Sequence, residues 1–76
     1  MSPEAIVEEV ASAHVLTVEE LVGPRRVREI VDARSEAAFR LWNETDLRLW
    51  QIGDVLGGRD HSTIHYLVAR HSLRVR

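Results

Sequence analysis

The 76-residue sequence contains no cysteine and no lysine, and only four of its residues are aromatic. Without cysteine there is neither a disulfide framework nor a thiolate metal site, so we expect a cytoplasmic protein. No run approaches the roughly 20 apolar residues of a membrane-spanning helix. The N-terminus also lacks the basic region followed by an apolar one that marks a signal peptide. A chain this short is expected to form one domain, residues 1–76, with little room for an enclosed substrate cavity.

The formal net charge of −2 conceals a polarised distribution. Residues 1–22 carry five glutamates and no arginine, whereas residues 23–34 carry four arginines against two acids. Residues 59–76 carry four arginines against one aspartate. A guanidinium presents a planar fork of donors that suits phosphates and guanine edges better than a lysine ammonium does. The basic segments therefore favour an anionic partner, while the glutamates form a solvated face or a docking site for a basic protein.

Apolar residues recur at helical spacing, and no segment alternates as a strand would. We expect an all-α domain of about five helices. Their expected ranges are 3–14, a short helix that Thr17 caps and Gly23-Pro24 ends, 27–43, 47–56 after an Asp46 cap, and a last helix from Asp60 or Ser62 to about 72. Thr17 and Glu20 together form a capping box.

The expected core consists of the apolar residues on the inward helix faces. They are Ile6, Val7, Val10 and Ala13 or His14; Val27, Ile30, Val31, Ala37, Ala38, Leu41 and Trp42; Leu49, Ile52, Val55 and Leu56; and Ile64, Leu67, Val68 and His71 or Leu73. Trp42 and Trp50 are expected to cover this core, although one of them could instead form an exposed apolar spot for a partner.

The junction between the last two predicted helices carries the most informative pattern. Gly57-Gly58 permits a sharp reversal, because glycine adopts backbone conformations that other residues reach only at a cost. Helix, glycine-containing turn and second helix in these lengths are typical of a helix-turn-helix. The second helix opens with five consecutive polar residues, 59–63, where a structural helix start needs only one cap. We therefore predict double-stranded DNA as the partner, with this helix in the major groove.

Each polar residue of this helix start can meet DNA. Arg59 can neutralise a phosphate, and Asp60 can accept from a cytosine amino group. His61 can contact a thymine methyl or a base acceptor, while Ser62 and Thr63 can bond to bases or phosphate. The plainer alternative is a solvated helix N-terminus.

Two other chemistries are less consistent with the sequence. His61 and His65 are four residues apart, but no cysteine or well-placed carboxylate completes a zinc tetrahedron, so no metal is expected. Asp60, His61 and Ser62 are the residue types of a hydrolase triad. Adjacent helical residues point in different directions and cannot relay one proton, so we expect neither a catalytic residue nor an enzyme.

Residues 52–64, IGDVLGGRDHSTI, resemble the signature I-G-x-x-F-G-G-R-D-H-[ST]-T-V of the C-terminal DNA-binding domain (domain IV) of the bacterial replication initiator DnaA. Upstream and without a gap, residues 25–34 resemble that family's basic loop, K-R-S-R-x-I-V-x-A-R. The resemblance covers nearly the whole chain. It implies a Trp-repressor-like helical fold and binding to the DnaA box, with neither a cofactor nor a small-molecule substrate.

The resemblance also implies individual roles. Base readout would fall to Arg26 in the minor groove and to Asp60, His61 and Ser62 in the major groove. Phosphate contacts would fall to Arg25, Arg28, Arg34, Arg59 and Thr63.

The sequence departs from the family pattern at several positions. Leu56 stands for Phe, Trp42 for a phosphate-contacting Lys or Arg, Glu36 for an apolar residue, Asp32 for a basic or neutral one, and His65-Tyr66 for an apolar-His pair. The sequence has no G-x-x-x-x-G-K-[ST] nucleotide-binding motif. The chain is then either a stand-alone protein or an isolated fragment of a longer one. The Met1 start and the departures favour a stand-alone regulator that competes for or marks DnaA-box-like sites. The alternative is a protein-interaction module that binds a replication or phage partner through its acidic helix or tryptophans.

Overall fold

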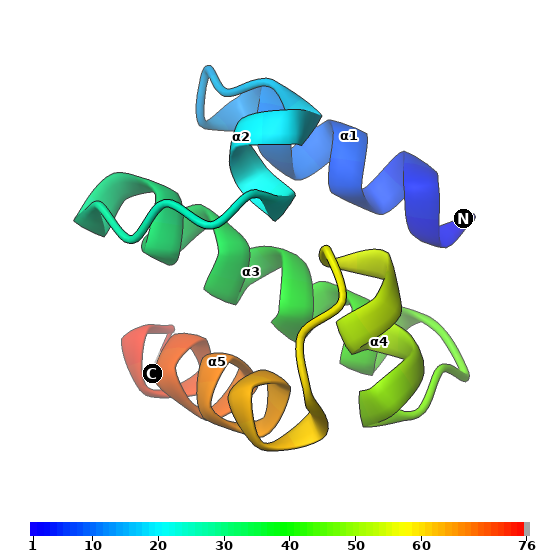
Figure 1. The fold of residues 1–76 in the computed structure, drawn as a ribbon. Helices are drawn as coiled ribbons and strands as arrows, with labels where there is room; N and C mark the ends of the chain where they lie inside the picture. Colours follow the sequence, from blue (N-terminus) through cyan, green and yellow to red (C-terminus); the bar gives the residue numbers. More distant parts are fainter. Residues whose placement is uncertain (76) are drawn as a thin grey trace.

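The computed structural model describes residues 1–75, which fold into five helices and contain no strand (Figure 1). The helices are α1 (Pro3–Ala13), α2 (Val18–Val22), α3 (Arg28–Glu44), α4 (Leu49–Val55) and α5 (His61–Arg74). The prediction of an all-α domain with about five helices is confirmed. The capping box at the start of α2 is also confirmed, since Thr17 Oγ1 accepts from the Glu20 N–H at 3.0 Å and Glu20 Oε1 accepts from the Thr17 N–H at 2.9 Å.

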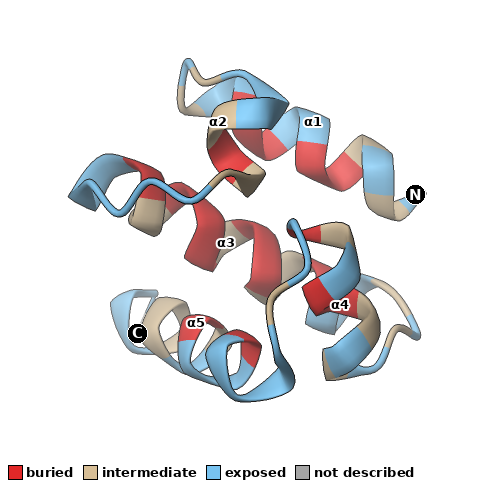
Figure 2. Ribbon diagram, in the orientation of Figure 1, coloured by how far each residue is buried: buried red, intermediate tan, exposed pale blue. Residues whose placement is uncertain are grey.

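The central element is α3, which contacts each of the other four helices. In Figure 1, α1 and α2 lie on one side of it and α4 and α5 on the other. Its inward stripe includes Ala33, Ala37 and Ala38, all completely buried. Their small side chains let the neighbouring helices approach closely. The buried residues gather along α3 and on the helix faces turned toward it (Figure 2).

Two residues expected in the core lie on the surface. Val27 is 42% exposed and Trp42 47% exposed. Val27 is the N-cap of α3 and therefore precedes the helical repeat that points inward. Trp42 follows the fully buried Leu41, and consecutive helical residues are rotated by about 100° around the axis. Leu73 is also exposed, whereas His71 is partly buried and lies 5.0 Å from Phe39 between ring centroids.

The fourth helix begins later than predicted, and Asp46 does not cap it. The N-cap is Arg48, whose N–H donates to Gln51 Oε1 at 2.8 Å. The preceding turn is held by Thr45, whose hydroxyl donates to the Leu41 carbonyl and accepts from the Leu47 N–H. These side chains organise the segment before α4, so the helix starts at Leu49.

Ion pairs on one side and a hydrogen bond on the other connect α3 to the neighbouring elements. Asp32 of α3 lies 2.7 Å from the Arg70 guanidinium and 2.5 Å from that of Arg74, both on α5. On the other side Glu36 lies 3.1 Å from His14, just after α1. Asp32 and Glu36 are two of the positions that depart from the family pattern. Each of these two departures from the family pattern thus places on α3 a carboxylate that contacts a basic side chain of another part of the chain.

No helix among residues 1–75 is both long and apolar enough to cross a membrane.

Because of the ion pairs of Asp32, the free energy of unfolding depends on pH. The Arg74 and Arg70 guanidiniums hold the pKa of Asp32 below its ordinary value, against the opposing effect of burial. A depressed folded-state pKa contributes stability that is present above the unfolded pKa, about 4, and is lost as pH falls through the folded value. We expect Asp32→Asn to lower the free energy of unfolding by about 1 kcal/mol at pH 7 and by much less near pH 2.5. Urea unfolding at the two pH values measures both terms.

Asp54→Asn, an exposed change on α4, is the matched control for this prediction. It should change stability by less than about 0.5 kcal/mol at either pH. Equal losses in the two variants at pH 7 would contradict a stabilising role for the Asp32 pairs.

Candidate nucleic-acid interface

The turn between α4 and α5 depends on close backbone approaches. Gly57 and Gly58 have φ angles of +89° and +84°, in the left-handed region that favours glycine. The N–H groups of Gly58 and Arg59 both donate to the Gly53 carbonyl, at 2.8 and 3.0 Å. A Cβ on Gly53 would lie 1.9 Å from the Arg59 carbonyl oxygen, and one on Gly57 would lie 2.2 Å from that of Val22. The turn therefore folds tightly onto α4 and onto the end of α2.

The first turn of α5 presents the residues predicted to read bases. Asp60 is the N-cap, and its Oδ1 accepts from the Thr63 N–H at 2.8 Å. This backbone hydrogen bond is the main reason that the pKa of Asp60 lies below its ordinary value. Asp60, His61, Ser62 and Thr63 are all exposed. Asp60 thus has a structural role in addition to any contact with DNA, and substitutions there must preserve the cap.

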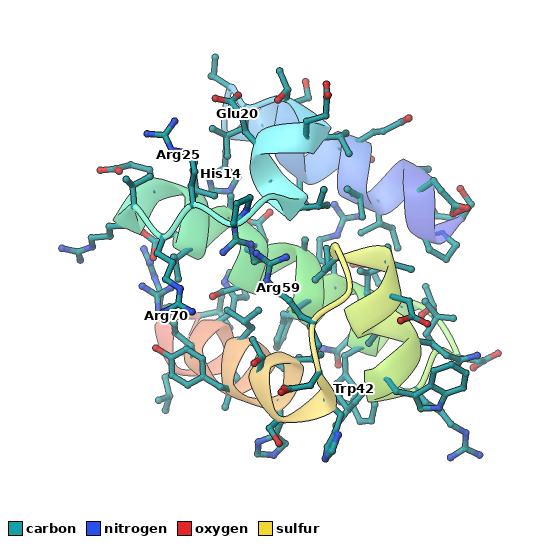
Figure 3. All side chains as sticks on the ribbon, in the orientation of Figure 1. His14, Glu20, Arg25, Trp42, Arg59 and Arg70 are labelled. Atoms are coloured by element: carbon teal, nitrogen blue, oxygen red, sulfur yellow. The ribbon has the colours of Figure 1, made fainter. Side chains whose placement is uncertain are left out.

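The basic loop joins α2 to α3 and carries the second predicted set. Arg25, Arg26 and Arg28 are exposed, and Figure 3 shows Arg25 extending away from the helices. Pro24, before them, and Val27, between Arg26 and Arg28, are exposed as well. The loop therefore directs its cationic side chains outward, as a DNA-contacting segment requires.

Arg34, predicted to contact phosphate, is instead buried. It is 4% exposed and its guanidinium donates to three carbonyls of the preceding segment: Leu21 at 2.8 Å, Gly23 at 2.9 Å and Arg25 at 3.0 Å. Burial lowers the pKa of Arg34 to about 10, and the charges of Arg59 and Arg26 add to this effect. It stays protonated at neutral pH. The assignment of Arg34 to phosphate is wrong, because its donors are engaged inside the fold.

Arg59 also turns inward. Its guanidinium donates to the carbonyls of Val22, at 2.8 Å, of Gly23 and of Leu56. In Figure 3 its side chain lies between the helix-turn-helix turn and the basic loop. Burial, and then the charge of Arg26, lowers the pKa of Arg59. We call Arg34 and Arg59 the arginine clamp, since together they fix the basic loop beside the turn.

The two tryptophans line a groove formed by the end of α3, the segment before α4 and the first residue of α5. Trp42 and Trp50 are 47% and 58% exposed and line a space of about 630 Å³ that also reaches His61. The expectation that both tryptophans cover the core is therefore wrong. Among residues 1–75, no three His, Asp or Glu side chains gather in an arrangement that could hold a metal ion.

Comparisons with known proteins agree with this geometry. Residues 3–70 match the family model described as the bacterial DnaA protein helix-turn-helix. The chain belongs to this family, the C-terminal domain IV of DnaA. It is 46% identical over 66 residues to the chromosomal replication initiator protein DnaA of Roseiflexus castenholzii, covering 87% of this chain and 14% of that protein. It is 41% identical over 68 residues to DnaA of Corynebacterium jeikeium, covering 90% of this chain and 12% of that protein.

The chain thus spans about one-seventh of the length of these DnaA relatives. The matched part is the helix-turn-helix domain, and the region with the ATPase motor has no counterpart among the 76 residues. DnaA domain IV is a family of double-stranded DNA-binding domains that recognise the DnaA box. The family and the fold inferred from the sequence are therefore confirmed.

Sequence reasoning missed the clamp, although one signal for it was present. Arg34 lies four residues after Ile30 and three before Ala37, on the inward stripe of α3. A charged residue on a buried stripe needs partners inside the fold. Arg59 gave no comparable signal, because it bonds to carbonyls 36 and 37 residues away in sequence.

The two glycines of the turn should differ in their tolerance of a side chain. In Gly58→Ala only the left-handed conformation is penalised, by about 1–2 kcal/mol, since a Cβ there meets no atom within 4 Å. In Gly57→Ala the approach to the Val22 carbonyl adds to that penalty, so we expect a loss of about 3 kcal/mol or more. Urea unfolding compares the variants directly. Similar losses in both would show that the approach of Gly57 to Val22 is unimportant.

The clamp predicts that Arg34 matters for stability. Arg34→Met leaves three carbonyls without their donor and should lower the free energy of unfolding by about 3 kcal/mol. Arg28→Met, at an exposed position nearby, should change it by less than about 0.5 kcal/mol. Thermal or urea unfolding measures the difference. If Arg34→Met were as stable as Arg28→Met, the clamp would not hold the loop.

Proposed function

We propose that this domain binds double-stranded DNA sequence-specifically at DnaA-box-like sites. The start of α5 enters the major groove, and the basic loop inserts Arg26 into the neighbouring minor groove. The observation that carries the proposal is the arginine clamp, which binds both the loop and the turn before α5. Two exposed DNA-contacting segments are thereby held in one rigid unit, as recognition of adjacent grooves requires.

The roles within this interface follow from exposure and chemistry. Arg26, Asp60, His61 and Ser62 are exposed and read bases. Arg25, Arg28 and Thr63, also exposed, contact phosphates and position the domain. Arg34 and Arg59 act indirectly, by holding the loop. Phosphate contacts dominate the affinity, so binding falls steeply as salt concentration rises.

The biological role we propose is regulatory or accessory, in replication or transcription. By itself, a DnaA-type helix-turn-helix domain occupies a site and supplies no ATP-driven assembly on it. Such a domain competes with, or marks sites for, proteins that recognise the same sequence.

A second candidate function is favoured by the tryptophan groove. Two half-exposed indoles that line one groove are unusual on a surface that only water covers. In this alternative the groove takes an apolar segment of a replication or phage protein. A gel shift at moderate salt separates the candidates, because an interaction module would not discriminate between a DnaA-box duplex and a scrambled one.

The central experiment is a fluorescence anisotropy titration of a DnaA-box duplex and a scrambled duplex of the same composition. We expect preferential binding to the box, and an affinity for both duplexes that declines linearly on a log–log plot against salt. Equal affinity for the two duplexes would overturn the proposal of box recognition.

Base readout can be separated from helix capping at Asp60. Asp60→Ser keeps a side chain able to accept from the Thr63 N–H, so the fold should remain intact. The serine lacks the reach and charge of the carboxylate, so discrimination should fall by about 1–3 kcal/mol for a lost base contact. Anisotropy with both duplexes measures this discrimination.

Two further variants control this measurement. Asp54→Ser changes the net charge identically at an exposed position on α4 and should leave discrimination unchanged. Arg28→Ala should weaken binding to both duplexes alike and reduce the salt slope by about 1. If Asp60→Ser and Arg28→Ala lowered specific and non-specific binding by the same factor, the division between base readout and phosphate contact would be refuted.

A further inference from the structure

A cleft of about 720 Å³ separates the basic loop from α5. Gly23, Pro24 and Arg26 of the loop line one side, and Thr63, Tyr66 and Leu67 of α5 line the other. Arg34 and Arg59, the arginine clamp, also contribute to the lining. The cleft thus lies between the two segments proposed to enter adjacent grooves of DNA.

The charge in this cleft is entirely positive. Three guanidiniums line it, those of Arg26, Arg34 and Arg59, and no aspartate or glutamate of the described residues does. The three groups are near enough for the charges of Arg26 and Arg59 to help lower the pKa of Arg34, after the larger effect of burial. Partly buried like charges are screened less than charges in open solvent, so an anion in the cleft would be strongly attracted.

Two hydroxyls stand on the wall that α5 provides. Thr63 and Tyr66 are three residues apart and therefore share one face of the helix. His61 and His65, four apart, lie on a different exposed face. Tyr66 is 59% exposed, so its phenol is accessible to a ligand at the cleft. α5 consequently presents two hydroxyl groups at the cleft, and His61, predicted to read bases, lies on a different face.

The shape of DNA determines what would occupy such a cleft. Each sugar-phosphate strand separates a major groove from a minor groove. A domain with α5 in one groove and Arg26 in the next must therefore straddle a strand, and the space between the two segments receives its phosphates. A phosphodiester matches both the positive charge and the hydroxyl donors of the cleft.

We infer that this cleft is the seat of a backbone phosphodiester, and that Tyr66 donates its hydroxyl hydrogen bond to that phosphate alongside Thr63. The inference rests on the proposed function and adds a contact to it. In this arrangement Tyr66 fixes the register between the major-groove and minor-groove contacts without reading a base. Its effect on affinity is independent of sequence.

The test combines Tyr66→Phe with duplexes in which one phosphate at a time is replaced by a neutral methylphosphonate. Tyr66→Phe removes only the hydroxyl and should weaken binding to box and scrambled duplexes alike, by about 5- to 20-fold. The salt slope should stay unchanged, because the substitution removes no charge. One methylphosphonate position should weaken the wild type markedly, and the same replacement should weaken Tyr66→Phe much less. Ser12→Ala, which removes an exposed hydroxyl from α1, is the matched control and should bind as wild type does.

The outcomes distinguish this inference from the proposed function. If the wild type prefers the box but Tyr66→Phe binds every duplex equally well, the phosphate seat is wrong and box recognition stands. If the wild type binds no duplex, both fail. A titration of the free domain with inorganic phosphate, followed by NMR, tests whether the cleft binds free phosphate. Suppose that inorganic phosphate causes saturable NMR shifts at Arg26 and Tyr66, while every methylphosphonate replacement weakens the wild type and Tyr66→Phe equally. This result would overturn the assignment to DNA in favour of a free phosphate site.

Discussion

The interface depends on two guanidiniums that point into the protein. Arg34 from α3 and Arg59 from the helix-turn-helix turn donate to carbonyls of residues 21–25 and of Leu56. Without these donors several backbone carbonyls in partly buried positions would have to find water or remain unsatisfied. The clamp converts a loop that contains exposed arginines and one proline into a fixed segment. It thereby determines where the exposed Arg25 and Arg26 lie relative to the start of α5.

The clamp in turn depends on the packing of α3. Ala33, Ala37 and Ala38 bring the neighbouring helices close to its axis, and Arg34 occupies the same buried stripe. A long side chain is accommodated there because its charged end reaches the carbonyls at the end of α2. The glycines complete the arrangement on the other side, since Gly57 approaches the Val22 carbonyl that Arg59 also binds. Arg34, Gly57 and Arg59 therefore belong both to the packing of the helices and to the structure that positions the interface.

The sequence predicted the elements of the fold better than the direction of individual side chains. Apolar periodicity located four of the helices, and the Thr17–Glu20 capping box with Gly23-Pro24 located α2, because these signals are local. Asp46 was a poor guide to α4, since Thr45 and Gln51 compete for the same backbone groups. Charge and family pattern alone could not separate Arg34 and Arg59 from the outward arginines. That distinction depends on which carbonyls the folded chain brings near, and most of those contacts are remote in sequence.

The carboxylates are distributed so that some arginines are paired with them, while the arginines that line the cleft are not. Arg40 pairs with Glu9 and Glu44, and Arg70 and Arg74 pair with Asp32, whereas no carboxylate of the described residues lines the cleft. Around the cleft, burial lowers the pKa of Arg34 and of Arg59, and the charge of the nearby Arg26 adds to the effect at both. The free domain therefore carries a local repulsion that an anion in the cleft removes. The repulsion between the guanidiniums falls only when DNA is bound. It therefore favours the bound domain over the free domain and adds to the affinity, without adding to the stability of the free domain. In the proposed complex the positive charge of the cleft attracts the DNA strand, while the hydrogen bonds of Arg34 and Arg59 to backbone carbonyls hold the loop and the turn in place.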